Sequence, residues 1–101
     1  MIIIAVKYID WDNEKNKKLK DERGISFEDI YILIQEDKIL EIIDHPNHKQ
    51  YPNQKIILVV IDDYIYMVPF VEDEGKYFLK TIIPSRKMTK NYLKKRGGEN
   101  L

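Results

Sequence analysis

The chain has 101 residues, 17 basic and 17 acidic side chains, and no cysteine. This length fits a single domain, residues 1–101, that buries a modest core without disulfides or a metal, and the lack of cysteine excludes thiol catalysis and thiolate metal sites. The apolar start is interrupted by Lys7 and is far shorter than the ~20 residues that span a bilayer, so we expect a cytoplasmic protein with no membrane contact.

The first part of the chain predicts a strand and a surface helix. Residues 2–11 are rich in β-branched side chains, which favours a strand. Asp12 fits a helix N-cap, and the helix at 15–23 is almost wholly charged, so Leu19 must hold it to the core. Gly24 then fits the position after a helix end, where glycine adopts a left-handed conformation cheaply.

A second helix is predicted from residue 26 onward. Ser26 and Asp29 have the spacing of a capping box, with Asp in place of the usual Glu or Gln. An apolar stripe follows at helical spacing, and we expect it to be the main helical contribution to the core: Phe27, Ile30, Tyr31 and Ile34.

The second half of the chain predicts four strands and a final helix. Asp62-Asp63 is a connection of hairpin length, although the lack of glycine also allows a wider turn. Pro69 cannot donate a ladder hydrogen bond, which indicates an edge position or a bulge. The predicted elements are strands at 38–44, 55–61, 64–71 and 77–83, a long loop at 45–54, and a helix after Ser85 that ends before a flexible tail at 97–101.

This order of elements favours the α+β class. We expect an antiparallel β-sheet meander with two N-terminal helices and a basic C-terminal helix, and the first strand could pair anywhere in the sheet.

Charge is distributed unevenly along the chain. Residues 1–50 carry eight basic and eleven acidic side chains, whereas residues 76–101 carry eight basic ones and only Glu99. Arg86 and Lys87 fall in the first turn of the last helix, where the macrodipole disfavours cations. A bound phosphate would offset that cost, so we predict that both side chains hold one, with Lys90 and Lys94 beside them. The alternatives are a solvated helix and an Arg86 paired with Glu72 or Asp73.

Further candidates are spread over other elements. Lys80 interrupts an apolar strand and should share a face with Phe78 and Ile82, so it either reaches the sheet edge or lines a cleft. His45 and His48 lie in the long loop and titrate near neutral pH, although loop histidines are more often ordinary turn residues.

Three more side chains have weaker signals. Tyr92 could move a proton or stack on a base, but its spacing from Met88 suggests that it packs inward. Lys18 and Arg23 could form a second basic wall, although the acidic residues between them favour a merely solvated helix.

With these residues in view, the chain resembles the BrnT-type family of bacterial toxins. Residues 10–15, DWDNEK, resemble that family's W-D-x-x-K element, and residues 24–28, GISFE, resemble its G-[VI]-S-F-E segment. Residues 83–89, IPSRKMT, are similar to its strand-to-helix turn. Each motif is short, but the three occur in the family's order with comparable spacing.

The resemblance implies a fold like that of RelE-type ribonucleases and an RNase activity that needs no cofactor or metal. It also implies a cognate antitoxin, often one with a ribbon-helix-helix DNA-binding region, so that operator DNA is bound only through the complex.

Two functions remain open from the sequence. In the first, RNA is cleaved: Arg86 and Lys87 neutralise the phosphate, Lys80 stabilises developing charge, and a loop histidine or Tyr92 moves protons. In the second, the basic helix binds nucleic acid or an acidic partner without catalysis.

Overall fold

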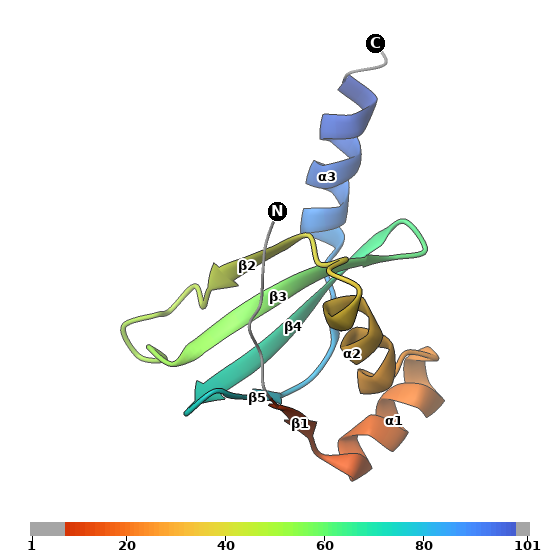
Figure 1. Cartoon of the computed structure of the whole chain (residues 1–101). Coiled ribbons are helices and arrows are strands. Elements are labelled where there is room, and N and C mark those ends of the chain that lie inside the picture. Colours follow the sequence, from red (N-terminus) through yellow and green to blue (C-terminus); the bar gives the residue numbers. More distant parts are fainter. Residues whose placement is uncertain (1–7, 99–101) are drawn as a thin grey trace.

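The computed structural model describes residues 8–98, which form three helices and one six-stranded sheet (Figure 1). The elements are β1 (Tyr8–Trp11), α1 (Asn13–Arg23), α2 (Phe27–Gln35), β2 (Glu41–Asp44), β3 (Gln54–Ile61), β4 (Tyr64–Asp73), β5 (Lys76–Leu79), β6 (Ile83–Pro84) and α3 (Arg86–Gly98).

The α+β class is confirmed, and the sheet is mixed rather than wholly antiparallel. Its strand order is β1-β5-β4-β3-β2, with β6 pairing the start of β4. Strands β2 to β5 form the expected antiparallel meander, but β1 pairs in parallel with β5. The part of the predicted first strand at residues 2–7 lies outside the described residues. Helix α3 continues to Gly98, past the predicted start of a tail, and residues 99–101 are also outside.

Both N-terminal helices begin and end as their local sequences predict. Asp12 accepts a hydrogen bond from the backbone N–H of Glu14 at the start of α1, and Gly24 ends that helix with φ of 68°. Ser26 and Asp29 form a reciprocal capping box at the start of α2. A capped helix end leaves fewer unpaired N–H groups, so these residues fix where each helix begins.

The main core lies between the two N-terminal helices and one face of the sheet, which we call the inner face. Phe27 and Ile30 of α2 are fully buried there against alternate residues of β3 and β4. Leu19 holds α1 to the same core as expected. Tyr31 is a correction, because it is 40% exposed and is not part of the buried cluster; its ring lies edge-on to that of Trp11.

A two-residue turn joins β3 to β4. Asp62 and Asp63 have φ of 53° and 61°, the left-handed pair that a type I′ hairpin turn requires. Aspartate tolerates this conformation better than most side chains, which explains a tight turn without glycine. Strand β2 begins at Glu41, three positions later than predicted.

A bulge separates β5 from β6 opposite Pro69. The pairs Phe70–Leu79 and Met67–Ile83 leave two residues of β4 facing three residues of the opposite segment, 80–82. The predicted bulge at Pro69 is therefore confirmed, and the ladder is interrupted where proline has no N–H to give.

The bulge also overturns the prediction that Lys80, Phe78 and Ile82 share one face. The extra residue shifts the alternation, so Ile82 is fully buried in the inner core together with Leu79. Phe78 and Lys80 are exposed and point away from that core. The side chains do not alternate strictly between the two faces of the sheet here, because the strand is not continuous.

Candidate nucleic-acid interface

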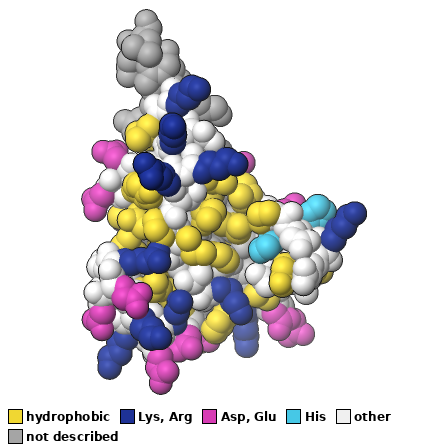
Figure 2. All heavy atoms as spheres, turned by 180° about the vertical axis from the view of Figure 1, so that it is seen from behind, with side chains coloured by type: hydrophobic (Ala, Val, Ile, Leu, Met, Phe, Trp, Pro, Cys, Tyr) yellow, Lys and Arg dark blue, Asp and Glu magenta, His cyan; other side chains and the backbone are white. Residues whose placement is uncertain are grey.

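The second face of the sheet, which we call the outer face, is covered only in part. Helix α3 lies over one end of it, where Met88 and Tyr92 pack against a small cluster of Ile56, Leu58 and Ile65. Figure 2 shows hydrophobic side chains gathered on this face, with both Lys or Arg and Asp or Glu side chains around their margin. An apolar surface with cations at its margin is a candidate for a polyanion that also carries flat apolar groups.

Two hydrogen bonds fasten the start of α3 to β4, and a third lies within the first turn of the helix. The Ser85 N–H donates to the Ile65 carbonyl (2.9 Å), the Ile65 N–H donates to Thr89 Oγ1 (2.8 Å), and Thr89 Oγ1 donates to the Ser85 carbonyl (2.7 Å). Ser85 Oγ also accepts the Met88 N–H (3.2 Å) and so caps the helix. Ser85 and Thr89 are both buried, which fixes the position of the first turn.

Arg86 and Lys87 follow the cap and are exposed. Among the described side chains, ion pairs join Lys20 to Glu28 and Lys38 to Glu36. Arg86 therefore forms an ion pair with neither Glu72 nor Asp73. Within the described residues neither Arg86 nor Lys87 forms an ion pair, so two cations stand at the positive end of the helix dipole. This is the charge arrangement that a bound phosphate relieves.

A hollow of about 560 Å³ lies between α3 and the β2–β3 edge of the outer face. Tyr92 and Asn91 line it from the helix, and Glu41 lines it from β2. Lys87, Asn91 and Lys94 share one side of α3 because residues four and three apart lie in line on a helix. The cations that flank the hollow are thus Lys87 and Lys94, while Lys90 lies four residues after Arg86 on another line.

Glu41, which lines the hollow, was not predicted from the sequence as a candidate site residue. Its neighbours Ile42 and Ile43 made the segment resemble an ordinary strand, and nothing local distinguishes a lone exposed acid. Its place beside Tyr92 depends on the pairing of Glu41 with Leu58, which brings it under α3.

The loop histidines lie at the other end of the sheet from Arg86. The His45 N–H donates to the Gln54 carbonyl (3.3 Å), and Gln54 pairs with Val71, whereas α3 begins beside Ile65. Those two β4 positions are about 20 Å apart at ~3.3 Å per residue. The structure therefore does not bring His45 and His48 together with Arg86.

Local contacts occupy His45 within the loop. Its Nδ1 accepts the Asn47 N–H (3.0 Å) and its ring lies 4.8 Å from that of Tyr51. His48 is exposed. Within the described part of the chain, no three His, Asp or Glu side chains gather closely enough to hold a metal ion.

The basic residues of α1 lie in the layer of helices that covers the inner face of the sheet. Lys18 is exposed there, away from the hollow. Arg23 reaches further, because its Nη1 donates to the Ile82 carbonyl (3.2 Å) just before the β6–α3 junction. It therefore braces the segment that leads into Arg86 rather than forming a wall beside α3.

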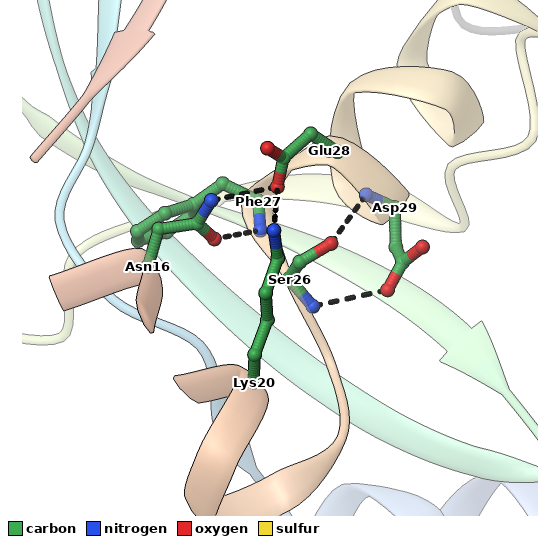
Figure 3. Close-up of polar contacts among 6 residues, drawn as sticks. All are labelled: Asn16, Lys20, Ser26, Phe27, Glu28 and Asp29. Atoms are coloured by element: carbon green, nitrogen blue, oxygen red, sulfur yellow. Dashed lines mark hydrogen bonds and ion pairs between the residues drawn. The ribbon is translucent and has the colours of Figure 1, made fainter. Parts of the chain in front are cut away.

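A polar network that the sequence did not reveal joins α1 to α2 (Figure 3). Asn16 is buried; its Oδ1 accepts the Phe27 N–H (2.7 Å) and its Nδ2 donates to Glu28 Oε1 (2.6 Å). The Asn16 hydrogen bond, aided by the charge of Lys20 at 3.5 Å, holds the pKa of Glu28 below its ordinary value of 4.5. The network links the two helices and has no contact with the outer face.

Comparison with known proteins gives one family. A family model described as the ribonuclease toxin BrnT of type II toxin–antitoxin systems matches residues 11–91, which include all three motifs noted in the sequence except Asp10. Searches of curated proteins and of solved structures gave no match. No helix within residues 8–98 is long and apolar enough to cross a membrane. With four-fifths of the chain matched, the protein belongs to the BrnT family of ribonuclease toxins of type II toxin–antitoxin systems.

Proposed function

We propose that this chain cleaves RNA on the outer face, beside α3, without a metal ion. The 2′-OH of one nucleotide attacks its own 3′-phosphate, which leaves a 2′,3′-cyclic phosphate and a free 5′-OH on the next nucleotide. This reaction needs a base for the 2′-OH, an acid for the leaving 5′-oxygen and cations for the charge on the phosphate.

The observation that carries the proposal is the pair of uncompensated cations at the α3 start. Arg86 offers two parallel donors to phosphate oxygens, and Lys87 adds a second charge on the side that faces the hollow. The buried Ser85–Thr89 fastening holds both residues in place against the sheet. A phosphate bound there would gain from the helix dipole as well as from both side chains.

Proton transfer is assigned to groups in the hollow. Glu41 and Tyr92 both line the hollow, and in this proposal Glu41 takes the 2′-OH proton and Tyr92 protonates the 5′-oxygen. Lys80 lies along the same face and stabilises charge on the neighbouring phosphate. His45 and His48 keep a role only in binding RNA that runs along the face, together with Lys90 and Lys94.

The same surface also accounts for neutralisation of the toxin by its antitoxin. We propose that the cognate antitoxin covers the apolar outer face and so blocks RNA. Whether the antitoxin carries a ribbon-helix-helix region, and binds operator DNA through it, is a separate question that a DNA-binding assay of the purified complex answers.

The test compares purified wild-type protein with Arg86→Ala and with Lys17→Ala, which removes an exposed cation from α1. Wild type and Lys17→Ala should cleave RNA in EDTA and leave 2′,3′-cyclic ends, whereas Arg86→Ala should lose at least about tenfold in rate, as expected for one strong charge-assisted contact. Thermal stability of all three should agree. Rescue of activity by Mg²⁺ after chelation, or full activity of a folded Arg86→Ala, would refute the mechanism, and RNA binding without cleavage would favour the non-catalytic module.

A further inference from the structure

An exposed aromatic ring stands on the outer face at the end away from α3. Phe78 of β5 is 40% exposed, although it lies in a strand of four residues flanked on both sides by other strands. Large apolar side chains in such positions normally turn inward, as Leu79 does beside it. Phe78 lines a hollow of about 430 Å³ together with Lys76 and with residues of β1 and β4 that include Asp10 and Asp73.

The surroundings of the ring are polar and follow from the strand register. Asp10 of β1 pairs with Phe78 on one side, and Val71 of β4 pairs with it on the other. Lys76 lies two positions before it on β5, and Lys80 lies two positions after it, just past the end of β5, so both point to the same face. The Lys80 N–H still bonds the Pro69 carbonyl (2.8 Å), so the alternation holds through Lys80 before the bulge begins.

This combination fits single-stranded nucleic acid better than it fits an apolar protein segment. A base stacks on an aromatic face whatever its sequence, and lysines on either side match the phosphates of the neighbouring nucleotides. The Lys76 ammonium lies over the Tyr8 ring, 5.8 Å from its centroid, and Tyr8 lines the same hollow.

Asp10 supplies a way to choose the base. Its Oδ1 accepts the Trp11 N–H (2.8 Å), which orients the carboxylate, and the residue lines the hollow. The edge of a splayed-out base can be read by hydrogen bonds, and a carboxylate only accepts them. Guanine alone presents two adjacent N–H donors on its Watson–Crick edge, whereas adenine and cytosine put a ring acceptor beside their amino group.

The site lies within reach of RNA held at α3. Phe78 pairs with Val71 and α3 begins beside Ile65, a separation of about 20 Å along β4 at ~3.3 Å per residue. That length is a few nucleotides of extended chain. Lys80 lies between the two ends, so cations continue along the path.

We propose that Phe78 stacks on a base of the bound RNA and that Asp10 selects guanine there. The proposal rests on RNA being the ligand of the outer face, as proposed above, and adds a base-reading site distinct from the cleavage site. It predicts a preference for RNA with guanine a few nucleotides from the scissile phosphate.

The experiment measures binding without cleavage, with fluorescently labelled 2′-O-methyl RNA oligonucleotides that lack the attacking hydroxyl. Phe78→Ala should weaken binding roughly tenfold to a hundredfold, the usual effect of removing one stacked base contact, and Phe78→Trp should restore it. Tyr31→Ala is the matched control, since Tyr31 is also 40% exposed but lies on α2. Asp10→Asn keeps an acceptor for the Trp11 N–H and should remove a guanine-over-adenine preference of about tenfold.

Each alternative gives a different result. Equal affinity of wild type and Phe78→Ala overturns the stacking site even if wild type cleaves RNA normally. If Phe78→Ala leaves the RNA affinity unchanged but weakens binding of the cognate antitoxin, the stacking site is overturned in favour of a protein-docking surface. Failure of wild type to bind any oligonucleotide overturns this site and the proposed function together, whereas binding as expected with no cleavage of natural RNA defeats only the cleavage mechanism.

Discussion

The two faces of the sheet are built from the same alternating strands but are used differently. The inner face is closed by α1 and α2 and holds most of the fully buried side chains, including Phe27 and Phe70. The outer face has only the first turns of α3 over a three-residue buried cluster, and it leaves Phe78 and Ile83 exposed. Stability therefore depends mainly on the inner face, which leaves the outer face available for ligands.

The largest expected effect separates two phenylalanines on neighbouring strands. Phe70 is 1% exposed and Phe78 is 40% exposed, so Phe70→Ala should lower the free energy of unfolding by about 3–5 kcal/mol and Phe78→Ala by no more than about 0.5 kcal/mol. Urea titration followed by circular dichroism measures both. Equal losses would show that the outer face contributes to the core as much as the inner one.

A smaller loss is expected from the Asn16 network. Asn16→Ala would leave the Phe27 N–H without its acceptor in a buried place, which should cost about 1–3 kcal/mol. Asn13→Ala is the control, because Asn13 is an exposed residue of the same helix. RNA binding by folded Asn16→Ala should match that of wild type, and a selective loss of binding would contradict the assignment of this network to the inner layer alone.

The smallest effect is a pH dependence at Glu28. Its pKa is lowered in the folded protein, chiefly by the Asn16 hydrogen bond, so the ionised carboxylate stabilises the fold above the ordinary value of 4.5, and this contribution is lost as pH falls through the lowered pKa. Glu28→Gln should therefore be less stable than wild type at neutral pH, and the gap should narrow below pH 4.5. Thermal melts of both proteins across that range test the sign; a gap that widens in acid would contradict it.

Local signals in the sequence predicted much of the inner layer. Asp12, Gly24 and the Ser26–Asp29 capping box each act within a few residues, and the structure has all of them. Burial of Leu19 followed from its being the one apolar side chain on a charged helix. The family was likewise recognised from three short motifs, and the family model confirmed it.

The features that the sequence did not predict all depend on pairing between residues that are far apart in the chain. The parallel contact of β1 with β5 joins segments far apart in the sequence and has no local signature. The inward turn of Ile82 requires the bulge opposite Pro69, and the place of Glu41 requires its pairing with Leu58 beneath α3. The catalytic and binding roles assigned to Arg86, Lys80, Tyr92 and the other candidates stay predictions until the variants are measured.

The parallel β1–β5 pair has a consequence for the order of folding. The β3–β4 hairpin closes through a two-residue turn, whereas β1 cannot pair until β5, near the far end of the chain, has been made. Contacts so distant in sequence are slow to form, so we expect β1 to dock last. Tyr8 and Asp10 both belong to β1, and the hollow beside Phe78 is complete only then. With the roles proposed above, an incompletely folded chain would hold phosphate at α3 before it could discriminate between bases.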